Sequence, residues 1–183
     1  HQQYGGPFSN VPVTEDIVMY EVNLRAFSQD GNLAGVQQKL DHLASLGVNV
    51  IWLMPIQTNG GPLNSPYCIS NFYEVDEEYG TLADLRAFVD EAHNRDMAVI
   101  LDWVANHTSW DHPWIDSVGW HTTDAQGNII HPSGTNWTDV ADLNFDHLDL
   151  QHQMIDAMRY WVLEANVDGY RLSLIHISEP TRP

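Results

Sequence analysis

Asp102, Asn106 and His107 lie close together at the end of the sequence Ala-Val-Ile-Leu-Asp-Trp-Val-Ala-Asn-His, residues 98–107. The carboxylate and the imidazole could bind a hydroxylated ligand, and the amide oxygen could bind a cation. Active sites of parallel α/β proteins form at the carboxyl ends of the strands, so these residues predict part of a ligand site. The alternative is ordinary hydrogen bonding in a cap or loop at the end of a strand.

Aromatic side chains form a second group with the chemistry to bind a ligand. Tyr67 follows Pro66 in a loop, and four tryptophans lie between residues 108 and 147. Aromatic rings stack on the C–H faces of sugars and keep a polar edge for hydrogen bonds. For any single tryptophan the simpler interpretation is structural, because a subdomain too small for an aliphatic core can use indole rings instead.

Metal ligands are restricted by the residues available. The histidines between residues 108 and 147 do not have the spacing of a structural zinc site, and Cys68 is the only cysteine, so zinc is not expected. Calcium prefers oxygen ligands, and Asn106 and Asp142 stand at the two ends of this segment. A calcium ion between them would join the segment to the rest of the domain, although two ligands alone do not define a site.

Composition excludes several classes of partner. The chain has 183 residues, of which 43% are hydrophobic, which is enough for one domain with a substantial core. Its net charge of −18 argues against binding to nucleic acids or anionic membranes. No apolar run approaches the roughly 18 residues of a membrane span. With one cysteine no internal disulfide is possible.

Four strands and three helices are predicted around the polar residues. Apolar runs predict strands over residues 17–24, 48–54 and 98–104, and residues 167–171 begin a fourth. This order of strands and helices predicts a right-handed parallel sheet, either half of an eightfold barrel or the front of a doubly wound sheet.

The three helices are predicted from a 3.6-residue apolar period. They cover residues 33–46, 81–94 and 149–165. The first carries its apolar stripe from Leu33 to Leu46 and ends at Gly47, and the second begins with a capping box of Thr81 and Asp84. Residues 108–147 lack any such period and contain Gly and Pro turn signals, which is typical of a functional loop or small subdomain.

Four stretches together resemble the catalytic domain of the α-amylase family of glycoside hydrolases. Asp102–His107 resembles the family's D-x-x-x-N-H region, and Gly47–Pro55 its second-strand pattern. Ala141–Asn144 resembles its P-D-L-N stretch, with Ala141 where proline is usual, and Asp168–Arg171 opens its D-G-[FYL]-R-x-D motif. Their order and spacing agree with the family from residue 17 to residue 171, and Ser65–Thr81 fits the segment between them.

The resemblance implies an α/β fold, namely the N-terminal half of a (β/α)8 TIM barrel with an irregular inserted subdomain after the third strand. The implied division of the chain is a lead-in (1–16), the first part of the barrel (17–107), the inserted subdomain (108–147), the third helix with the start of the fourth strand (148–171), and a tail (172–183).

The same resemblance implies roles for individual residues. In the substrate-binding set, Tyr67 would stack on the sugar ring at the cleavage point, and His107 would hydrogen-bond it. Asp102 would support His107 from below. Arg171 would keep the nucleophile's carboxylate ionised and correctly aimed. A structural calcium ion would be bound by Asn106 and Asp142, which match positions that bind calcium in many relatives.

The tail departs from the family. Ser173 stands where the resemblance requires an aspartate nucleophile two residues after Arg171. Leu172–Arg182 match one reading frame of a transposase-type sequencing-library adapter, so we expect the native sequence to stop at Arg171. The alternative is a genuine strand with a proline-containing exit. The general acid and the third carboxylate follow later strands in the family, so we expect no catalytic residue in this chain and no hydrolysis by it.

The function implied is that of a truncated glycoside hydrolase. The parent enzyme would cleave the α-glucosidic bonds of starch-like glucans or maltooligosaccharides by a retaining mechanism. The alternatives are a catalytically silent binding or structural protein, and a transglycosylase or isomerase on the same scaffold. Family habit implies an extracellular or periplasmic location, with no nucleic-acid or membrane partner. The oligomeric state is not predicted.

Overall fold

Four parallel strands form the centre of the fold in the order β1-β2-β5-β8. They are β1 (Met19–Val22), β2 (Val50–Leu53), β5 (Ala98–Val104) and β8 (Gly169–Ser173). The structure is a computed structural model that describes residues 3–60 and 63–173. Neighbouring strands all run in the same direction, which confirms the predicted parallel sheet. The carboxyl ends of β2, β5 and β8 therefore meet at one edge of the sheet.

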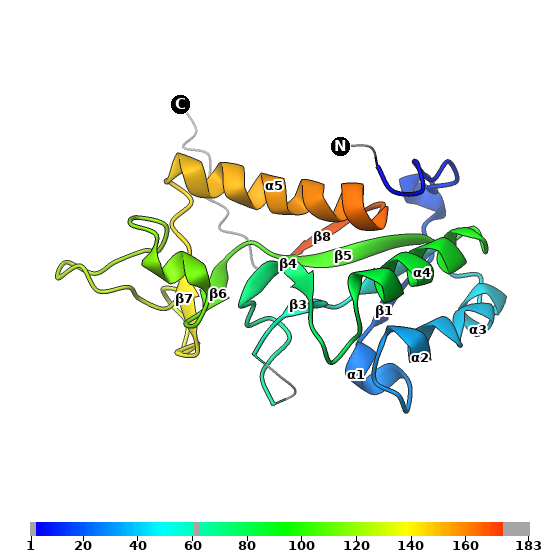
Figure 1. Cartoon of the computed structure of the whole chain (residues 1–183), viewed down its shortest axis with the longest axis horizontal. Coiled ribbons are helices and arrows are strands. Elements are labelled where there is room, and N and C mark those ends of the chain that lie inside the picture. The colour runs from blue at the N-terminus through cyan, green and yellow to red at the C-terminus, as the bar shows by residue number, and fades with distance from the viewer. Residues whose placement is uncertain (1–2, 61–62, 174–183) are drawn as a thin grey trace.

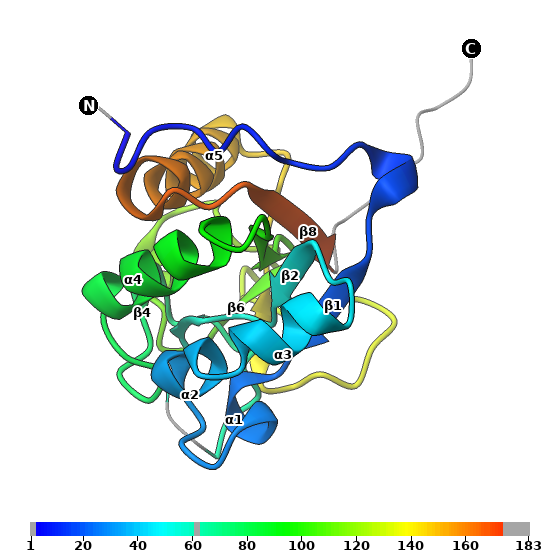
Figure 2. The ribbon, with the colours of Figure 1, turned by 90° about the vertical axis from the view of Figure 1, so that its right-hand side faces the viewer.

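Helices cover one face of this sheet (Figure 2). The longest, α5, lies along β8 and β5, with the insert at the opposite end of the molecule from α2 and α3 (Figure 1). The helices are α1 (Leu24–Phe27), α2 (Leu33–Gln37), α3 (Leu40–Ser45), α4 (Leu82–His93) and α5 (Leu148–Ala165), with a 3₁₀ turn η1 at Thr14–Asp16. None of the helices in the described ranges is long and apolar enough to cross a membrane.

Two antiparallel strand pairs lie outside the main sheet. β3 (Gln57–Thr58) pairs with β4 (Asn71–Val75), and β6 (His107–Ser109) pairs with β7 (Val140–Asp142). The second pair closes the base of the insert, which also holds a 3₁₀ turn, η2 (Pro113–Asp116). The insert is therefore tied to the sheet at the point where β5 ends.

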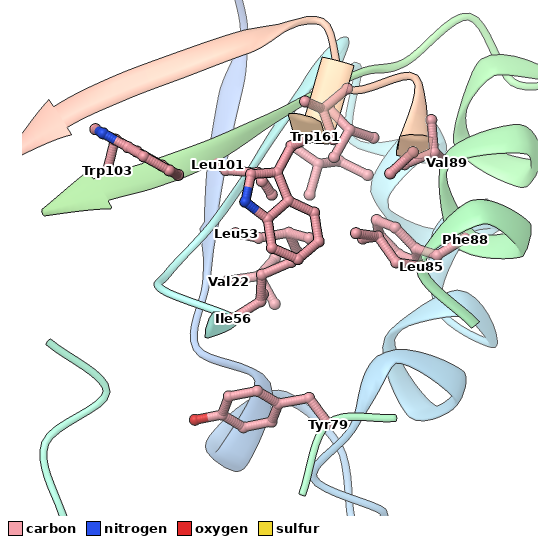
Figure 3. Close-up of a cluster of buried hydrophobic side chains, with 14 of the residues drawn as sticks. Val22, Leu53, Ile56, Tyr79, Leu85, Phe88, Val89, Leu101, Trp103 and Trp161 are labelled. Atoms are coloured by element: carbon pink, nitrogen blue, oxygen red, sulfur yellow. The ribbon is translucent and has the colours of Figure 1, made fainter. Parts of the chain in front are cut away.

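The main core lies between the sheet and helices α4 and α5. Trp161 of α5 is fully buried and lies against Leu101 and Leu53 of the sheet, with Phe88 of α4 beside it (Figure 3). Its indole Nε1 donates to the carbonyl of Phe72, 2.8 Å away, so the one polar atom of this buried side chain has a hydrogen-bond partner.

The lead-in contacts the two long helices, α5 and α4. The Tyr4 backbone N–H donates to the Leu163 carbonyl of α5 (2.7 Å), and its hydroxyl donates to Asp90 of α4 (2.8 Å). Phe8 stacks on His93 with ring centroids 4.2 Å apart. Residues 4–8 thus connect the two long helices.

Several predicted boundaries are wrong in detail. The predicted helix over 33–46 is two helices, α2 and α3, and Leu46 is 55% exposed because α3 ends at Ser45. The predicted strand over 17–24 is shorter, because the Asn23 side chain accepts from the Arg25 N–H and starts α1. β3, at residues 57–58, is a short strand that lies outside the four predicted strands.

Other predictions are confirmed. The Thr81 side chain accepts from the Asp84 N–H, and the Asp84 side chain accepts from the Thr81 N–H, which is the predicted capping box. Gly47 follows α3 with φ +80°, the left-handed conformation that favours glycine at the end of a helix. β8 continues through Leu172 and Ser173, the first two residues of the predicted tail, and residues 174–183 lie outside the described residues.

Candidate functional site

Asp102 is the centre of a polar cluster at the carboxyl edge of the sheet. Its side chain is 0% exposed, and its Oδ2 accepts from Trp52 Nε1 (3.1 Å), the Tyr67 hydroxyl (3.2 Å) and an Arg171 N–H (3.2 Å). The Ser173 hydroxyl donates to Oδ1. These donors come from β2, β8 and the 65–68 loop, so one buried carboxylate aligns three separate segments. Asp102 therefore supports Tyr67 and Arg171 directly, whereas the sequence placed it beneath His107.

Arg171 is held on two sides. Asp102 and Arg171 are register partners on β5 and β8, and their side chains form an ion pair. The guanidinium also lies over the Trp52 ring, with its carbon 4.5 Å from the ring centroid, in a cation–π contact. The Arg171 side chain is still 42% exposed, which leaves it accessible to a second carboxylate at the same edge.

Tyr67 presents a neutral hydroxyl to this cluster. Burial, together with the nearby charge of Asp102, raises the pKa of Tyr67 to about 12. The hydroxyl therefore stays protonated at neutral pH and donates to Asp102. This contact fixes the orientation of the aromatic ring that the sequence assigned to sugar stacking.

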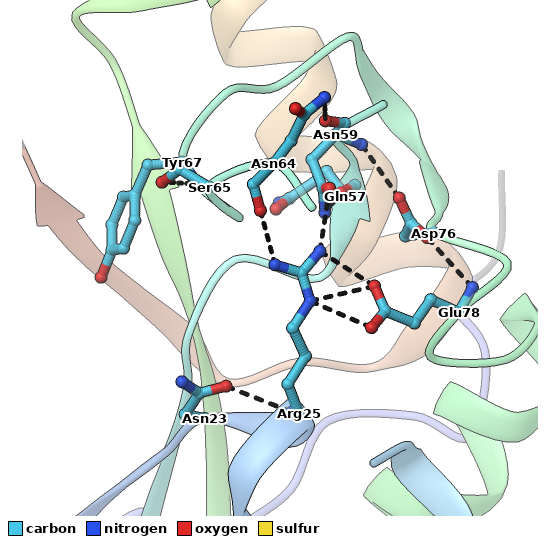
Figure 4. A network of polar contacts seen from close by, with 9 residues as sticks. All are labelled: Asn23, Arg25, Gln57, Asn59, Asn64, Ser65, Tyr67, Asp76 and Glu78. Carbon is cyan, nitrogen blue, oxygen red and sulfur yellow. Dashed lines mark hydrogen bonds and ion pairs between the residues drawn. The ribbon is translucent and has the colours of Figure 1, made fainter. Parts of the chain in front are cut away.

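Arg25 holds the loop that carries Tyr67 (Figure 4). Its guanidinium donates to the Asn64 carbonyl (2.6 Å) and to the Asn59 side chain (3.2 Å), and it pairs with Glu78 (2.9 Å). The loop is therefore attached to the beginning of α1 and to the segment before α4. The Tyr67 side chain points away from this network, as Figure 4 shows.

His107 has a protein partner at each ring nitrogen. The Asn106 amide Nδ2 lies 3.0 Å from Nδ1, and Nε2 lies 3.1 Å from the Tyr67 carbonyl. An amide N–H donates and a carbonyl accepts, so these partners fit the neutral tautomer that carries its proton on Nε2. Burial lowers the pKa of His107, which favours the same neutral form. To hydrogen-bond a sugar, the Nε2–H group must donate to the sugar and to the Tyr67 carbonyl at the same time.

A pocket of about 230 Å³ lies beside Tyr67 and His107, between the 65–68 loop and the insert. The residues that line it are Ser65, Tyr67, Cys68, His107, Trp137, Asp139 and Val140. The Trp137 ring stands edge-to-face to His107, with centroids 6.0 Å apart. Sequence reasoning did not assign Cys68, Trp137 or Asp139 to a pocket, because the two loops meet only in the folded chain. The aromatic character of Trp137 was the one available signal.

Asn106 and Asp142 lie together where the insert leaves the sheet. The Asn106 carbonyl accepts from the Leu143 N–H (3.0 Å), and Asp142 is the register partner of His107. Both residues are buried. The Asn106 Nδ2 lies against His107, so Oδ1 is the side-chain atom of Asn106 that could bind a cation, and Asp142 carries the kind of oxygen ligand that calcium prefers. No group of three His, Cys, Asp or Glu suited to a metal occurs within residues 3–60 and 63–173.

Comparison with known proteins identifies the family. Residues 14–134 match the family described as "Alpha amylase, catalytic domain". The chain is 31% identical to the α-amylase MalA of Haloarcula japonica, over 92% of this chain and 26% of that protein. It is 36% identical to the trehalose synthase/amylase TreS of Mycobacterium tuberculosis, over 86% of this chain and 32% of that protein. The chain therefore spans between about a quarter and a third of the length of these curated relatives.

Solved structures give the same result. An α-amylase from Lactobacillus plantarum has a TM-score of 0.81 and 38% identity, covering 92% of this chain and 40% of that one. The maltogenic α-amylase AmyB from Thermotoga neapolitana has a TM-score of 0.79 and 32% identity, covering 93% of this chain and 41% of that one. The parallel sheet thus matches the N-terminal half of their barrel, and this chain belongs to the α-amylase family of glycoside hydrolases.

Proposed function

We propose that this chain is the amino-terminal part of an enzyme that cleaves α-glucosidic bonds in starch-like glucans or maltooligosaccharides by a retaining mechanism. The observation that carries the proposal is the convergence of Tyr67 and Arg171 on the buried Asp102, beside a ring-sized pocket. This arrangement places an aromatic face and a cation at the carboxyl edge of a parallel sheet, where barrel enzymes build their active sites.

The described residues would act on the sugar before and during bond cleavage. Tyr67 would stack on the ring, and His107 would donate from Nε2 to one of its hydroxyls. Arg171 would hold the attacking carboxylate ionised, because a neighbouring cation lowers a carboxyl pKa. The resemblance puts that carboxylate at position 173, adjacent in space to Arg171 and Asp102.

Ser173 occupies this position in the present chain. Its hydroxyl donates to Asp102, and a serine does not form the glycosyl ester of the retaining mechanism. We therefore propose that the chain binds the substrate through the parts described above and does not hydrolyse it. A second carboxyl group would act as general acid in the parent enzyme.

Calcium and an exported location are part of the same proposal. Asn106 Oδ1 and the Asp142 carboxylate would supply two of the oxygen ligands, and the bound ion would fix the insert against the end of β5. The proposed location is extracellular or periplasmic. The proposed ligand is an α-glucan, and the proposal includes no nucleic-acid or membrane partner.

A transglycosylase or isomerase acting on the same bonds is the second candidate. The 36% identity to a protein described as a trehalose synthase/amylase supports this candidate. The products of the complete enzyme from maltose distinguish them: glucose alone indicates hydrolysis, and an isomeric disaccharide or longer oligosaccharide indicates transfer. A silent binding protein is the third candidate and would form neither product.

The direct test measures maltotriose binding by the 183-residue chain, with tryptophan fluorescence as the readout. We expect wild-type protein to prefer maltotriose over the β-linked cellotriose. Tyr67→Ala should weaken maltotriose binding about tenfold or more through lost stacking, and Tyr67→Phe should weaken it less because the ring remains. Circular dichroism of each variant checks the fold. Equal affinity for both trisaccharides, or wild-type affinity in Tyr67→Ala, contradicts the proposal.

A further inference from the structure

Asp139 connects the two loops that form the pocket. Its Oδ2 accepts from the Cys68 thiol, 3.4 Å away, so the insert is hydrogen-bonded to the residue that follows Tyr67. Burial raises the pKa of the Cys68 thiol to about 11, and the thiol therefore remains a donor at neutral pH. Asp139 itself lies at the exposed rim, where its carboxylate can meet an incoming ligand.

The pocket wall contains an acidic side chain and no basic Lys or Arg side chain. Among its seven lining residues Asp139 carries the one carboxylate. No lysine or arginine lines the pocket, and Arg171 of the neighbouring polar cluster is paired with Asp102. A ligand that fits this wall donates hydrogen bonds to a carboxylate and carries no negative charge of its own.

The size and the rings of the pocket define the ligand further. A volume of about 230 Å³ falls below the roughly 300 Å³ at which pockets for drug-sized ligands begin, so it holds one ring. Tyr67 and Trp137 border it from two different loops, and aromatic walls suit the apolar faces of a pyranose.

We propose that Asp139 is a specificity-determining residue, which accepts a hydrogen bond from a hydroxyl of a neutral pyranose and excludes sugars that carry a phosphate or carboxylate group in this pocket. The inference rests on the proposed function, because it assumes that the pocket binds a sugar of the α-glucan class. It goes further in naming the residue that selects neutral sugars and the charged class that is rejected.

The expected effect follows from Coulomb repulsion at the rim. A phosphate monoester carries about −1.5 to −2 charges at pH 7. Repulsion between two like unit charges about 4 Å apart in water weakens binding about fivefold, and salt makes this effect smaller. Removing the Asp139 charge should therefore improve binding of a phosphorylated sugar about five- to tenfold at low ionic strength.

The experiment compares maltose with maltose 6′-phosphate as probes for the 183-residue chain in low-salt buffer. Wild-type protein should prefer maltose, and Asp139→Asn should reduce this preference about five- to tenfold, mainly by tighter binding of the phosphate. Glu15→Gln, an exposed residue of η1, changes the net charge equally and should leave the preference unaltered. Cys68→Ala removes the thiol and keeps the carboxylate, so it should preserve the preference while weakening maltose binding.

Two negative results have different meanings. If wild-type protein binds maltose and Asp139→Asn keeps the wild-type preference, the role of Asp139 is overturned and the proposed function stands. The same holds if Glu15→Gln changes the preference as much as Asp139→Asn does. If wild-type protein binds neither sugar, the proposed function is overturned together with this inference.

Discussion

Replacing Asp102 tests whether one buried carboxylate organises the site. In Asp102→Ala the indole N–H of Trp52 and the hydroxyl of Tyr67 lose their acceptor. The Ser173 hydroxyl keeps only its longer bond to the Trp103 carbonyl, 3.3 Å away. Each hydrogen bond to a charged acceptor contributes about 1.5–3 kcal/mol, and stranded buried donors add a desolvation cost. Arg171 is partly exposed, so water would replace much of its lost ion pair. We expect a loss of about 3–4 kcal/mol in the free energy of unfolding.

Asp102→Asn should cost much less, for a geometric reason. Three donors converge on Oδ2 and one on Oδ1, so the asparagine oxygen can face the three donors while its N–H₂ donates to the Ser173 hydroxyl. Only the charge is then lost, and we expect a cost of about 1 kcal/mol.

Urea unfolding followed by tryptophan fluorescence measures both variants, with the free energy taken from the midpoint and the slope. Asp146→Asn is the control, because it removes an equal charge from an exposed position and should change stability by less than about 0.5 kcal/mol. The reasoning is refuted if Asp102→Ala stays within about 1 kcal/mol of wild type. It is refuted equally if the asparagine variant is the less stable of the two.

Two further predictions concern protons and calcium. Burial lowers the pKa of His112 to about 4 from about 6.5, so its stabilising effect is complete above pH 6.5 and is lost as the pH falls toward 4. His112→Asn keeps a side-chain acceptor for the Trp114 N–H. Between pH 7.5 and pH 4 its free energy of unfolding, measured with urea, should fall by up to about 3 kcal/mol less than that of wild type. Identical pH profiles for the two proteins would contradict this. Calcium at about a hundredfold excess over its Kd should raise the melting temperature by about 5–10 °C, measured against EDTA. Asp142→Asn should remove most of that rise, and an equal rise in the variant would rule out the proposed ligands.

Local signals in the sequence predict the helices better than the short strands. The start of α4 depends on Thr81 and Asp84, three residues apart, so it is visible in sequence. The division between α2 and α3 is hidden, because Leu33, Val36, Leu40 and Leu43 remain buried on one side through the break. β3 has two residues, too few for an alternating pattern, and depends on its pairing with β4.

Some residues of the site can likewise be predicted from the sequence, whereas the contacts between its loops cannot. Asp102 lies in β5, Arg171 lies in β8, and His107 begins β6 shortly after β5 ends. The apolar runs of β5 and β8 can be recognised in the sequence, so these polar residues can be placed at the same edge of the sheet. Asp139 and Cys68 are 71 positions apart in the sequence, and nothing local in either segment indicates their contact. The second partner of His107, the Tyr67 carbonyl, is a backbone atom and leaves no trace in the sequence.

The lead-in gives the fold a mechanical property. Residues 4–8 are bonded to α5 and α4, which precede β8 and β5, whereas the chain itself continues into β1 at the other side of the sheet. A force applied at the amino terminus would therefore act first on the Tyr4 contacts with α5 and α4, and reach β1 only after they rupture. Under tension the contacts of this segment with α5 and α4 would break first, and the strands that carry the site would be disturbed only afterwards.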